Sequence, residues 1–275
     1  MIVKAKIFKK NPKKYISFYK KHGYLLIKNS LSKILFKNIQ KSIISNLYKN
    51  TKKKVYKPLD SYELNKHLRI LRKKSPKKFS YFFDTLQTST ALNNFWTNKE
   101  TLKIIEILMG CEKSNISATD LLLRVDSPID VRNKLDWHQD SAYFKQNKSG
   151  YNGVNCWASL TKLTSEMGPL EFLENSHRLG CLKVKKSRGL NYSSLQRKIS
   201  KKITNKFKIK KFEMSQGDLL VMNMDMIHRS GANFSQIFRI STICRYHNMM
   251  SDDFQPGLNI YRYSNKKLNK EVHGF

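Results

Sequence analysis

Two histidines and one aspartate are the residues whose types and spacing point most directly to chemistry. His138 and Asp140 stand two positions apart, and His228 lies much later, in the run MIHRSG at 226–231. This is the ligand set of a two-histidine, one-carboxylate iron site, which leaves coordination positions open for a bidentate cosubstrate and dioxygen. A structural metal site would normally be closed. The three residues therefore predict an iron site that activates oxygen.

The elements around these residues must bring the three side chains together. On a strand, residues i and i+2 point to the same face, so His138 and Asp140 can converge on one ion while Gln139 points away. A second strand must then place His228 beside them. A histidine and an aspartate two positions apart arise by chance in many chains. The aromatic residues around this pair support the prediction of an iron site: Trp137, Tyr143 and Phe144.

Arg239 is a candidate anchor for a carboxylate near the metal. It follows His228 by eleven residues. This distance allows His228 to end one strand, residues 231–235 to turn and residues 238–246 to return antiparallel. A guanidinium presents two parallel N–H groups, which suit the two oxygens of a carboxylate.

Several ordered motifs resemble those of the phytanoyl-CoA dioxygenase family of iron(II)/2-oxoglutarate oxygenases, over nearly the whole chain. The match includes WHQD at 137–140, CWASL at 156–160, MGPLEFLENSHR at 167–178 and QGDLLV at 216–221. Near the N-terminus, FYKKHGYLLIKNSL at 18–31 is similar to the family's opening strand and following helix. One departure is Glu174 and Asn175, where the family usually has proline and glycine; it concerns the turn and not the metal ligands.

The resemblance implies a role for each matching residue. His138, Asp140 and His228 would bind iron. Arg239 would bind the distal carboxylate of 2-oxoglutarate, with help from the Ser230 hydroxyl.

Three further residues match positions that line the cosubstrate pocket in relatives: Gln139, Trp157 and Leu121. Strand alternation turns the Gln139 side chain away from the metal, so backbone or indirect contact is an equal alternative. Trp157 has an equal alternative as a core aromatic residue.

The activity that the resemblance implies is hydroxylation, in which 2-oxoglutarate and dioxygen are consumed at iron(II) and succinate and carbon dioxide are released. The carboxylate of Asp140 argues against the halogenating relatives, in which a small residue replaces it. The substrate would be a small metabolite, and the basic composition leans toward an acidic one. The alternative is a non-catalytic jelly-roll binding protein that docks a polyanion through its basic surface; succinate formation would distinguish the two.

The predicted fold is mostly β with flanking helices. One oxygenase domain spans residues 1–275, with a mainly helical part at 1–115, a double-stranded β-helix (jelly-roll, cupin-like) core at 116–262 and a tail at 263–275. Apolar residues four apart predict a helix at 32–48 behind a serine cap, and similar patterns occur at 60–71, 79–86 and 98–109. After residue 115 the apolar runs shorten to strand length between turn residues, as an antiparallel jelly roll requires. The helices are expected to buttress the sheet.

The formal net charge of +33 has several interpretations. Residues 1–59 contain no acid, yet lysines occur in almost every segment and no nucleic-acid motif accompanies them. A solvated basic surface is therefore favoured over a nucleic-acid role, with steering of an anionic substrate or contact with an anionic membrane surface as alternatives. Residues 183–211 hold twelve Lys and Arg and no acid, which fits either a solvated loop or an anion-attracting lid.

No membrane span or signal peptide is expected, because the longest apolar runs are of strand length and the N-terminus continues into lysines. The four cysteines have no paired spacing, which favours reduced thiols in a cytoplasmic protein: Cys111, Cys156, Cys181 and Cys244. Nothing in the sequence indicates the oligomeric state.

Overall fold

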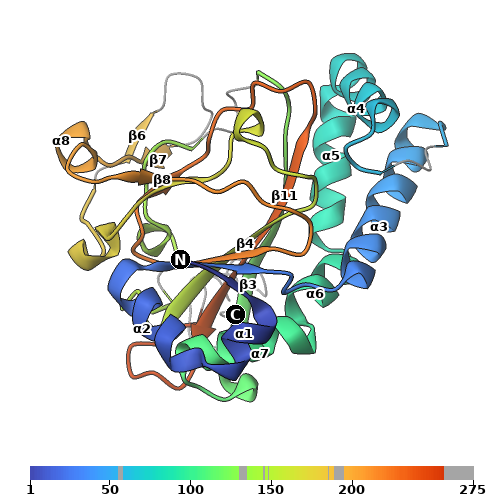
Figure 1. Cartoon of the computed structure of the whole chain (residues 1–275). Helices are drawn as coiled ribbons and strands as arrows, with labels where there is room; N and C mark the ends of the chain where they lie inside the picture. Colours follow the sequence, from blue (N-terminus) through green and yellow to red (C-terminus); the bar gives the residue numbers. More distant parts are fainter. Residues whose placement is uncertain are drawn as a thin grey trace, which may run out of the picture.

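A six-stranded sheet forms the main wall of the molecule (Figure 1). The computed structural model describes residues 1–54, 58–129, 135–144, 146–147, 149–184, 186–188 and 195–256. The strand order is β1 (Ile2–Lys4), β2 (Tyr24–Lys28), β9 (Leu219–Asn223), β4 (Gly153–Ser159), β11 (Arg239–Asn248) and β3 (Ile116–Asp126). β1 and β2 are parallel, and the other neighbours are antiparallel.

A smaller antiparallel sheet lies opposite the main one. Its strands, in order, are β10 (His228–Arg229), β5 (Glu171–Leu173) and β8 (Ile209–Lys210). Buried apolar side chains of both sides pack together between the layers, among them Leu26, Trp157 and Leu220 from the main sheet and Phe172 from β5. Two such layers around one interior form the jelly roll that the sequence predicts. β6 (Lys186–Arg188) and β7 (Leu195–Arg197) make a separate two-stranded sheet.

Helices cover the outer face of the main sheet, as expected (Figure 1). They are α1 (Ala5–Lys10), α2 (Pro12–His22), α3 (Lys33–Thr51), α4 (Tyr62–Lys74), α5 (Pro76–Gln87), α6 (Thr90–Thr97) and α7 (Lys99–Met109). One buried cluster joins helices and sheet, and two hydrogen bonds fasten α6 to β11: Trp96 Nε1 donates to Thr242 Oγ1 at 2.8 Å, and the Tyr246 hydroxyl donates to the Trp96 carbonyl at 2.7 Å. The helices therefore fix the strand that carries Arg239.

The four helices predicted from apolar spacing are confirmed as α3, α4, α5 and α7. Asn98 caps α7, because its Oδ1 accepts the backbone N–H groups of Glu100 and Thr101 at 3.0 Å. Ser32 occupies the N-cap position of α3, as predicted, but its side chain makes no cap hydrogen bond. The opening strand implied by the resemblance is β2, which joins β1 to the main sheet.

A bulge in β3 decides which of its residues face the interior. Ile243 of β11 pairs with Leu122, whereas Arg245 pairs with Thr119, so two residues of β3 oppose one residue of β11 between these pairs. Even-numbered residues pack toward the helices before the bulge, and odd-numbered residues do so after it: Ile116, Ala118, Leu121, Leu123 and Val125. Leu122 and Arg124 consequently line the space between the sheets.

The described part of the basic segment 183–211 packs against the segment that carries His138. Ile199 is buried in a cluster with Trp137, its N–H donates to the Trp137 carbonyl at 2.8 Å, and Lys198 pairs with Asp136 at 2.8 Å. The short helix α8 (Lys201–Thr204) follows. Lys185 and the side chains of Lys186 and Arg188, which the anion-attracting lid invokes, lie outside the described residues, as does the tail at 263–275.

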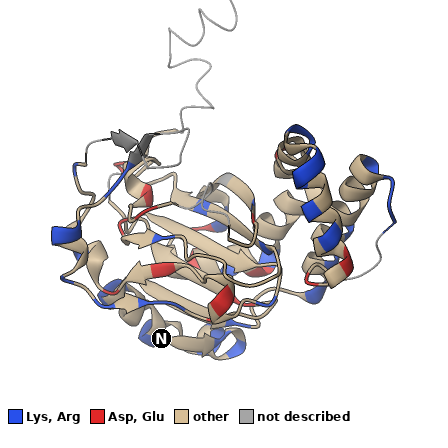
Figure 2. Ribbon diagram, turned by 90° about the horizontal axis from the view of Figure 1, so that it is seen from above, with Lys and Arg blue, Asp and Glu red and all other residues tan. Residues whose placement is uncertain are grey.

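Basic residues are spread over the surface rather than gathered on one face. Figure 2 shows Lys and Arg on the helices at one end of the molecule and on the loops at the other. All four cysteines are free thiols. In the described parts of the chain, no helix is both long enough and apolar enough to cross a bilayer.

Candidate active site

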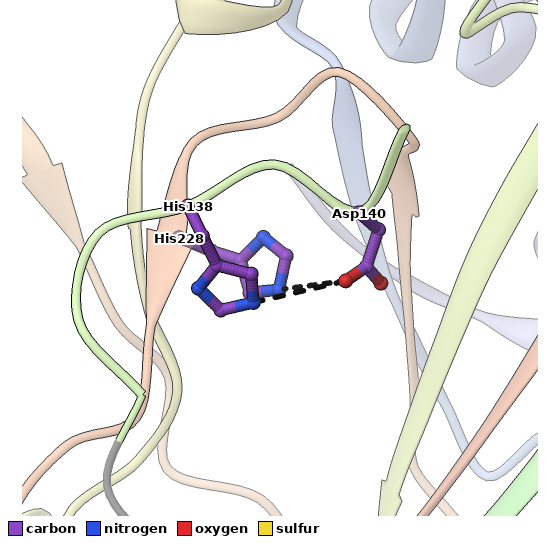
Figure 3. A group of neighbouring side chains, drawn as sticks. All are labelled: His138, Asp140 and His228. Carbon is purple, nitrogen blue, oxygen red and sulfur yellow. Dashed lines mark ion pairs between the residues drawn. The ribbon is translucent and has the colours of Figure 1, made fainter. Parts of the chain in front are cut away.

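The two histidines and the aspartate meet at one point, as the sequence predicts (Figure 3). His138 and His228 form an isolated antiparallel bridge, in which each backbone N–H donates to the other residue's carbonyl at 3.0 and 2.9 Å. Gln139 continues in an extended conformation, and Asp140 begins a short 3-10 turn. The i, i+2 geometry therefore holds for His138 and Asp140, although no regular strand contains them.

The distances in this group suit one metal ion. Asp140 Oδ1 lies 3.7 Å from His138 Nε2 and 3.8 Å from His228 Nε2, and the three candidate ligand atoms lie within 4.8 Å of one another. Two ligands that each bind an ion at about 2.1 Å can be at most about 4 Å apart. Both measured pairs satisfy this limit without movement of the backbone.

Each histidine is oriented by a carbonyl of its own segment. His138 Nδ1 donates to the Asp136 carbonyl at 2.7 Å, and His228 Nδ1 donates to the Met226 carbonyl at 2.9 Å. These bonds place the ring proton on Nδ1 and leave the Nε2 lone pair for the metal. The bond to a backbone carbonyl two residues earlier is the same for both ligands.

The protonation states also fit metal binding. Burial, followed by the neighbouring His228, lowers the pKa of His138 to about 3. Burial alone would raise the pKa of Asp140, but Arg245 and then the two histidines lower it to about 2. His138 is therefore neutral and Asp140 ionised near neutral pH, which are the forms that bind metals.

His138 and His228 line a cavity of about 60 Å³, and Asp140 contacts two other residues of its wall, Asn155 and Arg245. β11 contributes every second residue to its wall: Arg239, Ser241, Ile243 and Arg245. β4 contributes Asn155 and Trp157, and β3 contributes Leu122 and Arg124. The wall opposite the histidines thus comes from three adjacent strands of the main sheet.

Arg239 lies in this wall and is 5% exposed. Its Nη2 donates to Asp126 Oδ2 at 2.8 Å, and its Nη1 donates to the Gly231 carbonyl at 3.2 Å. Burial would raise the pKa of Asp126, but Arg124 and Arg239 lower it overall. The candidate carboxylate anchor is therefore part of a buried ion pair, which the sequence did not predict.

The predicted path from His228 to Arg239 is wrong in one respect. β10, which starts at His228, pairs with β5 of the small sheet, whereas β11, which starts at Arg239, pairs with β3 and β4 of the main sheet. The chain crosses between the two layers at residues 231–235 instead of returning beside itself. Arg239 therefore reaches the cavity from the wall opposite His228.

The remaining predicted pocket residues have different positions. Ser230 and Trp157 line the cavity. Trp157 also packs in the apolar cluster between the sheets, so it lies both in the cavity wall and in the core. Gln139 lies outside the lining: its Nε2 donates to the carbonyls of Gly180 and Asp225, both at 2.7 Å. Its Oε1 accepts the Leu182 N–H at 2.8 Å.

The pocket position predicted for Leu121 is wrong. Leu121 packs toward the helix-side cluster, and its neighbour Leu122 lines the cavity instead. Neighbouring residues of a strand face opposite sides, and the bulge in β3 decides that Leu122 and not Leu121 faces the cavity. A prediction based on matching positions was therefore wrong by one residue.

Among the residues that the structure describes, four buried polar residues of the site were missed in the sequence: Asp126, Asn155, Ser241 and Arg245. Arg245 Nε donates to Asp140 Oδ2 at 2.9 Å, and Asn155 Nδ2 donates to the same oxygen at 2.5 Å. Alternation along β11 from Arg239 would have identified Arg245, since it lies six residues later on the same face.

Comparisons with known proteins identify the family of the chain. A model of the phytanoyl-CoA dioxygenase (PhyH) family matches residues 19–241. A Caenorhabditis elegans protein described as a probable phytanoyl-CoA dioxygenase is 24% identical over 266 residues, which cover 93% of this chain and 80% of that protein.

Solved structures share the fold. The epimerase SnoN in complex with Fe3+, α-ketoglutarate and nogalamycin RO has a TM-score of 0.59 and 14% identity, over 90% of this chain and 95% of that one. EctD from S. alaskensis, solved with 2-oxoglutarate and 5-hydroxyectoine, has a TM-score of 0.55 and 13% identity, over 89% and 81% of the two chains. Since the family model spans most of its length, the chain belongs to the phytanoyl-CoA dioxygenase family of iron- and 2-oxoglutarate-dependent oxygenases.

Proposed function

We propose that this protein hydroxylates a small anionic metabolite with release of succinate and carbon dioxide. His138, Asp140 and His228 would hold iron(II), and Arg239 with Ser230 would bind the distal carboxylate of 2-oxoglutarate. The observation that carries this proposal is that two candidate ligands, His138 and His228, line one cavity with the buried Arg239. The third candidate ligand, Asp140, lies beside both histidines.

The donor set fits iron(II), because two neutral imidazoles and one carboxylate on one side leave the other side open. Iron bound there would supply dioxygen activation coupled to the oxidative decarboxylation of 2-oxoglutarate. The protein's own contribution is to bind, orient and exclude water. Arg239 lies in the wall opposite the histidines, so a carboxylate held by its guanidinium would direct the rest of 2-oxoglutarate toward them.

Apolar side chains around the site limit water and define where a substrate can lie. Trp157 and Ile243 are 3% and 8% exposed, and both line the cavity. Removal of water strengthens the charged contacts inside and protects reactive species from side reactions. Position within this apolar frame would select the carbon that is hydroxylated.

An anionic substrate is supported by the charges of the wall. Among the described residues, three arginines line the cavity (Arg124, Arg239 and Arg245), and two carboxylates, Asp126 and Asp140, contact them. Iron would add two positive charges and 2-oxoglutarate two negative ones. The balance remains positive, and the net charge of +33 would also attract an anion from solution.

We also propose that residues 1–275 form a single oxygenase domain in the cytoplasm. One buried apolar cluster runs from Val3 through the helices to Tyr246, which supports a single folding unit. The four free thiols fit a reducing compartment.

Succinate formation tests the proposed activity. Purified full-length protein is incubated with iron(II), ascorbate, dioxygen and 2-oxoglutarate, and succinate is measured with and without EDTA. We expect succinate above background even without the primary substrate, and its loss with EDTA. A matched surface control, Asp252→Ala, should behave as the parent. Absence of both succinate and 2-oxoglutarate binding would contradict the proposal.

A further inference from the structure

The two oxygens of Asp140 have different surroundings. Oδ1 faces the Nε2 atoms of His138 and His228 at 3.7 and 3.8 Å. Oδ2 accepts one hydrogen bond from Arg245 Nε at 2.9 Å and a second from Asn155 Nδ2 at 2.5 Å. One oxygen is thus directed to the metal position, and the other is held by the wall.

The two donors are cross-strand partners in the main sheet. Arg245 on β11 lies directly opposite Asn155 on β4, and side chains of such partners share one face at about 5 Å. Both residues are buried, at 5% and 4% exposure. The Arg245 guanidinium also packs over the Phe144 ring, 3.8 Å from its centroid. The main sheet, and not the short turn that contains Asp140, therefore fixes the two donors that bond to Oδ2.

A carboxylate can bind a metal through one oxygen or through both. We propose that Arg245 and Asn155 are positioning residues that restrict metal binding to Oδ1 of Asp140. Monodentate binding keeps one more coordination position open for cosubstrate and dioxygen. This inference rests on the proposed metal site.

The direction in which metal affinity changes when Arg245 is removed distinguishes a positioning role from simple charge repulsion. Arg245 carries a positive charge close to the site of a divalent cation, so charge repulsion alone would weaken metal binding. On that basis, removal of Arg245 would tighten it. If Arg245 positions Asp140, its removal instead weakens binding, because the carboxylate is no longer held.

The test is a titration of the full-length protein with Mn(II), without cosubstrate, in which free Mn(II) is measured by electron paramagnetic resonance. We expect Arg245→Met to weaken Mn(II) binding by about 10- to 100-fold, as loss of a residue that orients a metal ligand generally does. Asn155→Ala, which changes no charge, should weaken it by a smaller factor. Arg124→Met removes a guanidinium from the same cavity that does not contact Asp140, and should leave Mn(II) affinity unchanged or higher.

Unchanged or tighter Mn(II) binding by a folded Arg245→Met protein would overturn the inference. An effect confined to the KM for 2-oxoglutarate would do the same, because it would place Arg245 on the cosubstrate instead. If Arg245→Met does not fold, Asn155→Ala decides: parental Mn(II) affinity overturns the proposal and reduced affinity supports it. Parent protein that binds no Mn(II) or iron(II) would overturn the metal site itself, which is a separate result.

Discussion

The two sides of the cavity are built differently. On the metal side, His138 belongs to a single bridge, His228 to a strand of two residues and Asp140 to a short turn. On the opposite side, β11 runs for ten residues and β3 for eleven, in a ladder that the bulge in β3 interrupts. The candidate ligands thus depend on individual hydrogen bonds, whereas Arg239, the candidate carboxylate anchor, depends on the whole main sheet.

This difference suggests that the two sides can be disturbed separately. Changes at the two candidate histidines should affect metal binding and leave folding largely intact, because their side-chain hydrogen bonds within the described residues are to carbonyls of their own segments. A change at Asp140 should also lower stability, because the buried Arg245 and Asn155 lose their acceptor. Changes in the sheet wall should combine effects on cosubstrate binding and stability.

The largest effect is expected for the candidate ligands themselves. Asp140→Ala or His228→Ala should abolish succinate formation and weaken metal binding by about 100-fold or more, because one of three protein ligands is lost. Calorimetric titration with iron(II) under argon measures the affinity. Circular dichroism should show an unchanged fold. A variant that keeps parental iron affinity would remove that residue from the ligand set.

Replacement of Arg239 should separate cosubstrate binding from metal binding. Arg239→Met should raise the KM for 2-oxoglutarate by about 30- to 100-fold, since a charge-assisted pair contributes about 2–3 kcal/mol. Iron affinity should stay within about twofold, a margin far below the loss expected for a ligand. Thermal stability should also fall, because the buried Asp126 loses a partner. Equal loss of iron affinity in Arg239→Met and Asp140→Ala would contradict the separate roles.

In the proposed role of Arg239, Asp126 would compete with 2-oxoglutarate for the same guanidinium. Asp126→Asn should therefore lower the KM for 2-oxoglutarate, by roughly fivefold if one hydrogen bond of about 1 kcal/mol is relieved. The free energy of unfolding should decrease, since Arg239 remains buried with less counter-charge. Steady-state kinetics and urea unfolding measure the two quantities. A higher KM would instead show that Asp126 holds Arg239 in its binding position.

The smallest effect is expected at neighbouring leucines of β3. Leu121→Ala should lower the free energy of unfolding by about 2 kcal/mol, because Leu121 packs on the helix-side cluster. Leu122→Ala should cost less than about 1 kcal/mol, since Leu122 is 37% exposed, but should alter KM values. A larger loss of unfolding free energy in Leu122→Ala than in Leu121→Ala would place the bulge elsewhere in β3.

The sequence was sufficient to predict the layered fold and the meeting of His138, Asp140 and His228, because residue type and order carry that information. It also predicted that Arg239 lies near these three residues, in the wall of the cavity. It was not sufficient for Leu121, because a bulge has no distinct signal in the run TDLLLRVD. The hydrogen bonds of the Gln139 side chain could not be predicted either, because its partners are backbone groups of Gly180, Leu182 and Asp225, from distant segments. The contacts of Asn155 with Asp140 and of Asp126 with Arg239 depend on strand register, which the chain specifies only through its tertiary packing.

The bulge in β3 also marks where this wall could change length during evolution. Thr119 pairs with Arg245 and Leu122 pairs with Ile243, so deletion of one of the two residues between these pairs would restore regular alternation and leave Leu122 and Arg124 in the cavity wall. Deletion of Leu123, beyond the bulge, would instead exchange the two faces of the rest of the strand and move Arg124 and Asp126 into the apolar layer beneath the helices. Because burial of unmatched charges is costly, a change in length is more accessible at the bulge than in the part of β3 that follows it.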